Sequence, residues 1–175
     1  VALASLGASG QVCAQPAPRR AITHEDLWLM KRVGAPAPSP DGRWVAFSVT
    51  EPAYDESEQA SDLWLAATDG TTPPRRLTGT PARESGVDWS ADGTRLAFSS
   101  RRDGDEVEQV YVLTLAGGDA ARVTSSATGA RSPRFAPDGR RIAYVSDVHP
   151  GAATEDENRA AALERRDDIA AVIFE

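Results

Sequence analysis

The sequence has little cysteine and little histidine: among its 175 residues there are one cysteine, Cys13, and two histidines. Cys13 lies in a stretch of small and apolar residues, VALASLGASGQVCA, that resembles the end of a secretory signal. Cleavage after Ala14 would leave a chain without disulfides or thiolate metal sites. We therefore expect residues 1–14 to be a signal-peptide remnant, the protein to be periplasmic or secreted, and no cofactor to be bound.

Long apolar runs and a surplus of positive charge are also missing. A membrane-spanning helix needs about 20 consecutive apolar residues, which the sequence does not contain. The formal net charge is −7, whereas a nucleic-acid surface needs a basic patch or stripe. No G-x-S-x-G nucleophile motif, phosphate loop, dinucleotide fingerprint or zinc pattern occurs. We therefore expect no membrane span, no nucleic-acid partner and no catalytic activity of this chain on its own.

What the sequence does contain is one phrase repeated three times. The copies are SPDGRWVAFSV at 39–49, SADGTRLAFSS at 90–100 and APDGRRIAYVS at 136–146. In each copy an aspartate and a glycine form a tight turn, because the aspartate bonds local backbone and the glycine takes positive φ. The turn leads into a strand whose small alanine leaves room for a neighbouring sheet. Because they repeat, Asp41, Asp92 and Asp138 are interpreted as turn residues and not as a carboxylate site.

Further strand and turn signals recur between the phrases in the same order. The stretch DLWLAATDG at 62–70 aligns with QVYVLTLAGG at 109–118, and RLT at 76–78 aligns with RVT at 122–124. Each period thus holds four short strands, and repeats of roughly 40–50 residues are typical of β-propeller blades. A β-sandwich is the alternative, but true sequence repetition favours the propeller. The expected fold is all-β, an incomplete β-propeller of about two to three four-stranded antiparallel blades, since closure takes about four to eight.

Residues 15–38 are expected to form a short helix and a linker. Thr23 is suited to cap the helix at its N-terminus, and acidic residues follow in the first turn. Lys31 and Arg32 would lie near its end, and Gly34 would stop it. The prolines in 35–38 predict an extended linker without structure of its own.

Residues 39–175 are assigned to the partial propeller, which a helical insertion at 147–168 interrupts. Thr154 with Glu157 three residues later predicts a helix start, and the alanine-rich run that follows has good helix propensity. The apolar run at 169–174 predicts that a strand resumes. Since the chain starts at Val1 and ends directly after this run, we interpret it as an N-terminal fragment of a longer protein.

The functional side chains are expected on one face of the propeller. In a four-stranded blade the loop 51–61 and the insertion 147–168 lie on the face opposite the Asp-Gly turns, and elaborated loops on a rigid scaffold usually bind ligands. The acidic cluster in the insertion, Glu155, Asp156 and Glu157, is the candidate for substrate binding through a positively charged group. The alternative is that these acids stabilise a helix N-terminus. His24 and His149 are interpreted as surface residues. The aromatic residues expected to pack between blades are Trp44, Trp64, Trp89 and Tyr111.

These features resemble secreted serine peptidases of the prolyl oligopeptidase family, in the branch of dipeptidyl and acylaminoacyl peptidases. The resemblance is carried by the signal-like start ending in AQPAP, the lead-in ITHEDLWLMKRVGAPAPSPDGRWVAFSV, the repeated blades, and the insertion after YVSDV. It spans nearly the whole chain from about residue 20, and the blade phrase itself is shared with TolB-like propellers.

The resemblance implies a function for the chain. In that family a propeller caps a following α/β-hydrolase domain, which carries the Ser, Asp and His, and restricts access to short peptides. The implied partners are therefore the protein's own C-terminal hydrolase domain and a peptide substrate. The alternative is a non-enzymatic TolB-like periplasmic propeller that binds protein partners.

Overall fold

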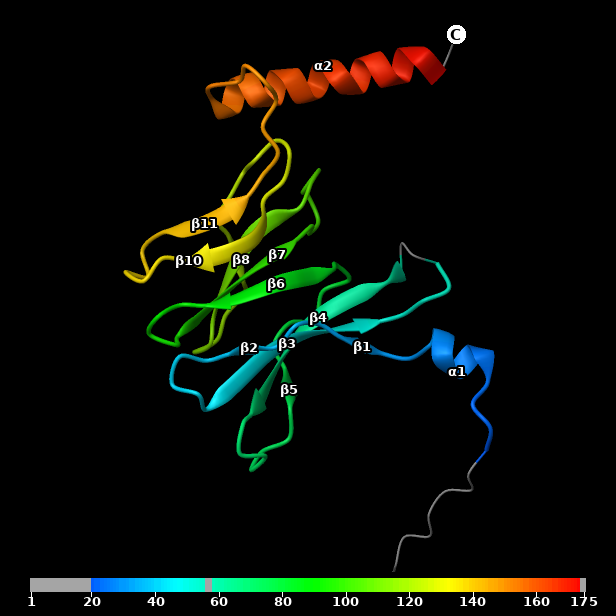
Figure 1. The fold of residues 1–175 in the computed structure, drawn as a ribbon, viewed down its shortest axis with the longest axis vertical. Helices are drawn as coiled ribbons and strands as arrows, with labels where there is room; N and C mark the ends of the chain where they lie inside the picture. Colours follow the sequence, from blue (N-terminus) through cyan, green and yellow to red (C-terminus); the bar gives the residue numbers. More distant parts are fainter. Residues whose placement is uncertain (1–19, 56–57, 174–175) are drawn as a thin grey trace, which may run out of the picture.

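The computed structural model describes residues 20–55 and 58–173, and three antiparallel sheets dominate it (Figure 1). The first sheet has the order β1-β3-β4-β5, with β2 also pairing with β3. Its strands are β1 (Arg32–Val33), β2 (Ala37–Pro38), β3 (Trp44–Glu51), β4 (Ala60–Ala67) and β5 (Arg75–Arg76). We call this sheet blade 1.

Two further sheets follow in the chain. Blade 2 has the order β6-β7-β8-β9 and blade 3 pairs β10 with β11. The strands are β6 (Glu84–Trp89), β7 (Arg95–Ser100), β8 (Gln109–Thr114), β9 (Ala121–Arg122), β10 (Arg131–Phe135) and β11 (Ile142–Val145). In Figure 1 the blades succeed one another from bottom to top and form no closed ring. The expected incomplete propeller of four-stranded antiparallel blades is confirmed.

The repeated alanine lets neighbouring blades approach one another, as expected. Ala46 of blade 1 is fully buried against Trp89 and Leu96 of blade 2. Ala97, the equivalent residue of blade 2, is buried against Ala130, beside blade 3. A larger side chain at these positions would separate the sheets, since protein interiors are close-packed. The core therefore consists of two seams, one on each side of blade 2.

Hydrogen bonds hold neighbouring blades in a fixed position relative to one another at both seams. The indole Nε1 of Trp89 donates to the carbonyl of Ala37 at 2.8 Å, which joins blade 2 to the inner strand of blade 1. The backbone N–H of Phe135 donates to the Asp88 carboxylate at 2.7 Å, which joins blade 3 to blade 2. Trp89 and Tyr111 are buried, as expected for packing aromatics.

The inner strand of every blade is interrupted at the same place. Residues 34–36 separate β1 from β2, and the register shifts between Ser85 and Asp88 in β6 and between Arg131 and Arg134 in β10. Gly86 has φ +66 and Ser132 has φ 51, so both adopt the left-handed region. The prediction that 35–38 form an extended linker without structure of its own is wrong, because β2 lies within this range and pairs with β3. Such bulges bend a strand and redirect its side chains.

The matching segments RLT at 76–78 and RVT at 122–124 lie at the outer edges of blades 1 and 2, directly after β5 and β9. Thr78 Oγ1 accepts the backbone N–H of Leu63 at 2.8 Å, and Thr124 Oγ1 accepts that of Val110 at 2.9 Å. In both motifs the arginine Nε donates to the threonine carbonyl at 2.7 Å. The motif therefore replaces strand pairing with side-chain bonds where β5 and β9 end.

The N-terminal helix is shorter than expected. Helix α1 spans His24–Trp28, with Thr23 as N-cap in a capping box with Asp26. The expected cap is confirmed, but the stop is wrong, because Leu29 ends the helix and Arg32 already belongs to β1. Pairing of β1 with β3 competes with helix extension here. The expected signal remnant, 1–14, lies outside the described residues.

The insertion helix is longer than expected. Helix α2 spans Glu155–Ile173, so the predicted strand at 169–174 is wrong as far as Ile173, and Phe174 lies outside the described residues. No glycine or proline follows Gly151, and nothing local therefore stops the helix. The expected capping box is present: the N–H of Glu157 donates to Thr154 Oγ1 at 3.2 Å. Neither described helix has the length and apolar composition to cross a membrane.

Candidate functional site

The Asp-Gly turns and the elaborated loops lie on opposite faces of the blades. The three turns lie together on the left in Figure 1, where Arg95 Nη2 of blade 2 donates to the Gly139 carbonyl of blade 3 at 2.7 Å. The opposite face, which we call the loop face, carries 51–61, 101–108, 123–130 and the start of the insertion. The predicted division of the two faces is thus present in the structure.

The first two Asp-Gly turns are built in the same way, and the third shares part of their hydrogen bonding. Asp92 Oδ1 accepts the Ser90 hydroxyl at 2.6 Å and the N–H of Thr94 at 3.0 Å. Asp41 accepts the equivalent bonds from Ser39 and Arg43. These bonds lower the pKa of both carboxyls to about 2, with the serine hydroxyl as the main cause. In the third turn Ala136 stands where the others have serine, so of this pattern Asp138 keeps only the bond from the backbone N–H of Arg140. The interpretation as turn residues fits this geometry.

A cavity of about 530 Å³ opens on the loop face, between β3 and β4 of blade 1, β6 of blade 2 and the start of β10 of blade 3. Hydroxyl groups and charged groups line it, among them Ser48, Thr50, Ser61, Glu108, Thr128 and Arg131. Such a surface can hydrogen-bond a polar, extended ligand such as a peptide backbone, and contains no large apolar wall.

Two carboxylates that line this cavity, Glu84 and Glu108, have a raised pKa, and Glu108 is the more exposed of the two. Burial raises the pKa of Glu108, while the charge of Arg131 and a hydrogen bond from Ser85 act in the opposite direction. The Ser85 hydroxyl lies 3.4 Å from its Oε1. A half-buried carboxylate facing a cavity is a typical site for a cationic group of a ligand.

A second cavity of about 420 Å³ lies between the insertion and blades 2 and 3. Val107, Ala162 and Leu163 form an apolar part of its lining, and His149 and Arg159 form a polar part. Thr128 and Val107 line both cavities. The two hollows are therefore neighbours on the loop face.

Asn158 anchors the insertion helix to the blades. It is 2% exposed, its Oδ1 accepts the backbone N–H of His149 at 2.8 Å, and its Nδ2 donates to the Asp147 carbonyl at 3.1 Å. Figure 1 shows that only the first turns of α2 approach the blades. The sequence analysis did not identify Asn158, because asparagine within an alanine-rich run looks like an ordinary surface residue.

The predicted acidic cluster lies at the start of α2, beside the second cavity. Glu155 accepts the backbone N–H of Ala127, which ties α2 to the 123–130 loop. Glu157 accepts the N–H groups of Ala153 and Thr154, which caps the helix. Asp156 is exposed, and among the described residues no hydrogen bond or ion pair engages its carboxylate. Two of the three predicted site residues therefore have structural partners.

Buried ion pairs support the loops from below. Glu84 is 1% exposed and bonds Arg102 Nη2 at 2.8 Å, and the Arg102 guanidinium lies 4.6 Å from the ring centroid of Tyr111. Tyr111 donates to Asp105 at 2.6 Å, and Asp105 pairs with Arg122 at 2.9 Å. Burial, with help from Asp105, raises the pKa of Tyr111 to about 12. This network fixes both ends of the 101–108 loop.

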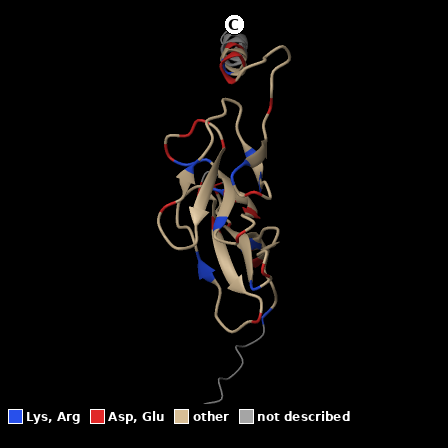
Figure 2. Ribbon diagram, turned by 90° about the vertical axis from the view of Figure 1, so that its left-hand side faces the viewer, with Lys and Arg blue, Asp and Glu red and all other residues tan. Residues whose placement is uncertain are grey.

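The two histidines lie in different places in the structure. His24 stacks on Trp28 in α1, and His149 lies at the second cavity. In the part of the chain that the structure describes, no three histidine, cysteine or acidic residues gather to hold a metal ion. Figure 2 shows positive and negative residues interspersed along the blades.

Sequence reasoning missed the residues that line the two cavities. Val107 and Glu108 lie in the connection between β7 and β8, Arg131 is the first residue of β10, and Leu163 belongs to the insertion. None of them is part of the repeated phrase. The signal that could have found them is this failure to repeat, because side chains that build blades recur and side chains that bind do not.

Comparisons with known proteins identify the family of this chain and several relatives. The family model described as the TolB beta propeller domain matches residues 28–160. The uncharacterized peptidase YuxL of Bacillus subtilis is 29% identical over 143 residues, which are 81% of this chain and 21% of that protein. Dipeptidyl-peptidase 5 of Porphyromonas endodontalis is 28% identical over 137 residues, 78% of this chain and 19% of that protein. The chain thus spans about a fifth of the length of these curated relatives.

A solved structure shows the same fold. The putative TolB from Agrobacterium tumefaciens superimposes with a TM-score of 0.52 at 27% identity, covering 72% of this chain and 41% of that one. The expected resemblance to peptidases is confirmed by the two relatives, and the TolB structure shows the similarity to TolB-like propellers. The chain belongs to the TolB beta propeller domain family.

Proposed function

We propose that this chain is the substrate-access propeller of a secreted or periplasmic serine peptidase that cleaves short peptides, of dipeptidyl or acylaminoacyl type. The observation that carries the proposal is the similarity to two peptidases over about four-fifths of this chain. In this proposal a hydrolase domain follows in the full polypeptide and supplies Ser, Asp and His. The chain described here supplies the surface that admits the peptide.

The loop face supports this role. The larger cavity offers hydroxyl and charged groups to a peptide backbone, and the smaller one offers an apolar pocket for a side chain. Asp156 and its neighbours Glu155 and Glu157 are proposed to attract the free amino group of the substrate. Asp156 is the member whose carboxylate is available for this.

The first experiment is to express the full-length gene product and assay it with dipeptidyl and N-acyl-aminoacyl p-nitroanilides. Cleavage that is lost with a serine-directed inhibitor supports the proposal. A protein without a hydrolase domain refutes it, and the assay also decides between the two substrate types.

A second experiment tests the access role. Val107→Trp would place a larger side chain where the two cavities meet and is expected to lower kcat/KM for peptide substrates several-fold, while a small ester substrate is cleaved as before. Val123→Trp is the matched control, because Val123 is half-exposed and lines neither cavity. Equal effects of the two substitutions would refute the access role.

The second candidate function is a non-enzymatic propeller that binds proteins of the cell envelope. The family description and the similarity to the solved TolB structure favour it. It predicts that the gene ends after the blades and that envelope proteins co-purify with the product. A hydrolase domain in the full-length sequence would exclude it.

A further inference from the structure

The sequence contains five aspartates that are directly followed by glycine, at 41–42, 69–70, 92–93, 103–104 and 138–139. In such a pair the glycine nitrogen can attack the aspartate side chain, because glycine carries no side chain to obstruct the approach. The reaction needs a protonated aspartate carboxyl group and a glycine nitrogen that is free to move. The folded structure therefore decides which of the five pairs can react.

The glycine nitrogen is held by a hydrogen bond in four of the five pairs. Its N–H donates to the carbonyl three residues earlier, at 2.8 Å for Gly93 and Gly139, 2.9 Å for Gly42 and 3.3 Å for Gly70. The N–H of Gly104 has no hydrogen-bond partner among the residues that the structure describes. The nitrogen of Gly104 can therefore move without breaking a bond.

The aspartate carboxylate is held in the same four pairs. Besides the bonds already given for the turns at 41 and 92, Asp69 Oδ1 accepts the N–H of Thr71 at 3.0 Å and its hydroxyl at 2.8 Å. Asp138 accepts the N–H of Arg140 at 2.9 Å. These hydrogen bonds lower the pKa of all four carboxyls, so less of each is present in the protonated form that reacts.

Asp103 differs from these four aspartates. It is exposed, and in the described part of the chain no hydrogen bond or ion pair engages its carboxylate. A Cβ built on Gly104 would meet no atom within 4 Å, so there is room for a ring at this position. Both reacting groups are thus free at 103–104 and held in the other four pairs.

We propose that Asp103–Gly104 is the site at which this protein forms isoaspartate spontaneously. The nitrogen of Gly104 attacks the side-chain carbon Cγ of Asp103, and the N–H proton leaves with the carboxyl hydroxyl as water, which closes a five-membered succinimide ring. Water then opens the ring at one of its two carbonyls. Opening at the side-chain carbonyl returns aspartate, and opening at the main-chain carbonyl gives isoaspartate, whose main chain runs through Cγ. The two steps release and take up one water, so no oxidant or further reactant is needed.

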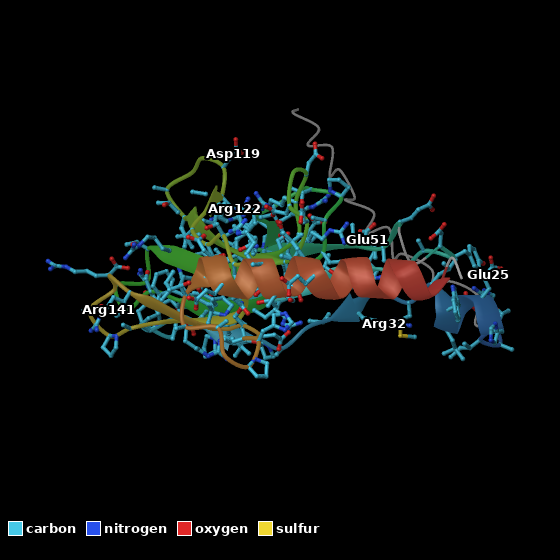
Figure 3. All side chains as sticks on the ribbon, turned by 90° about the horizontal axis from the view of Figure 1, so that it is seen from above. Glu25, Arg32, Glu51, Asp119, Arg122 and Arg141 are labelled. Carbon is cyan, nitrogen blue, oxygen red and sulfur yellow. The ribbon has the colours of Figure 1, made fainter. Side chains whose placement is uncertain are left out.

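Isoaspartate at this place would disturb a turn that supports blade 2. The N–H of Asp105 donates to the Arg102 carbonyl at 2.9 Å, and the N–H of Arg102 donates to Asp105 Oδ2 at 3.1 Å, so both bonds span the modified residue. Asp105 also pairs with Arg122 of β9, which Figure 3 labels close to Asp119. An additional main-chain carbon between 102 and 105 is expected to weaken these contacts at the outer edge of the blade.

Storage of the purified full-length protein at neutral pH and physiological temperature tests the proposal. Chymotrypsin, which cleaves after large apolar residues, places the five aspartates on five different peptides, and electron-transfer fragmentation distinguishes isoaspartate from aspartate in each. We expect isoaspartate to form about tenfold faster at 103–104 than at 92–93, the factor that corresponds to one hydrogen bond to a charged group. Equal rates, or a faster rate at any other pair, would overturn the proposal.

Unfolding and variants separate the fold from the local sequence. In urea all five pairs should react at similar rates, because their hydrogen bonds are lost. A pair at 103–104 that remains much faster in urea would overturn the structural reasoning. Ser90→Ala removes a bond to Asp92 and should raise the rate at 92–93, whereas an unchanged rate would contradict the protective role of that bond.

Asp103→Glu is the matched control for the consequence, because glutamate does not form the five-membered ring. After equal storage, the urea midpoint of the original protein should fall as isoaspartate accumulates, and that of Asp103→Glu should stay constant. An equal fall in both proteins would overturn the expected effect on blade 2. The test needs no peptidase activity, so its result is independent of the proposed function.

Discussion

Removing the carboxylate of Glu84 should strongly destabilise the seam between blades 1 and 2. Glu84 lies in β6 and accepts hydrogen bonds from Arg102 and from Thr78, a residue of the connection that leaves blade 1. Its side chain is completely buried, and that of Arg102 is 17% exposed. In Glu84→Ala the guanidinium stays in the protein without its partner.

The expected magnitude follows from the burial of both groups. Removing one partner of a buried ion pair costs about 3–5 kcal/mol, because the remaining charge is uncompensated. Glu84→Gln keeps the shape and one acceptor, so its cost should be about 1.5–3 kcal/mol, the range of a hydrogen bond to a charged group. Since domains are stable by only about 5–15 kcal/mol, the alanine variant should lose a large fraction of its stability.

Urea unfolding followed by tryptophan fluorescence measures this loss. Trp89 is a suitable reporter, because it is 8% exposed and bonds Ala37 across the same seam. Combining Glu84→Ala with Arg102→Met should recover part of the stability, since the second substitution removes the unpaired charge. A loss below about 1 kcal/mol for Glu84→Ala, with an unchanged m-value, would refute the reasoning.

The pH dependence of stability is a second, independent test of how Glu84 contributes to stability. Burial raises the pKa of Glu84 above its ordinary value of 4.5, so the folded protein holds this proton more tightly than the unfolded chain does. Its contribution to stability is therefore complete below pH 4.5 and is lost as the pH rises through the folded-state pKa. Glu84→Gln should remove this decline. If the stability of the variant declines with rising pH as much as that of the original protein, other groups cause the decline.

Three further predictions concern the turns, the bulges and the open edge. Asp92, whose pKa is about 2 in the folded state, contributes stability that is present above its ordinary value of 3.8 and lost as the pH falls toward 2; Asp92→Asn should flatten the acid limb of the stability curve, and an unaltered limb would contradict this. Gly86→Ala should lower the free energy of unfolding by about 1–2 kcal/mol, because the backbone at this position is left-handed, and by a further amount because the new Cβ would lie 3.4 Å from Ser132 Cα. Gly104→Ala, whose Cβ would lie in open space, should show the backbone cost alone. Urea unfolding measures both. Residues 15–175 alone should self-associate through β11, where Tyr144 and Val145 are exposed. With lysine at both positions, sedimentation velocity should show only the monomer. Persistent oligomers would indicate that another surface is responsible.

The blades could be predicted because their signals are local. The Asp-Gly turn involves bonds that span only two to five residues, such as those of Asp92 with Ser90 and Thr94, and its aspartate and glycine recur in each phrase. The helix caps at Thr23 and Thr154 are equally local. The extent of the helices could not be read in this way. Strand pairing shortened α1, and nothing local ended α2.

The candidate site was only partly accessible to sequence reasoning. The repeat correctly excluded the three turn aspartates and directed attention to the opposite face. The local pattern also predicted the capping role of Glu157, but it could not reveal that Glu155 bonds the 123–130 loop or that Glu108 faces a cavity between blades. These facts depend on contacts between segments far apart in the chain.

The sequence by itself therefore determined the turns, the strand order and the blade architecture, since a repeated phrase with its own hydrogen bonds folds the same way each time. The tertiary structure alone decided how the blades meet. The Glu84–Arg102 pair, the interrupted inner strands and the anchor Asn158 exist only when separate segments exclude water from one another. Burial sets the strength of these interactions, and burial is a property of the assembled blades.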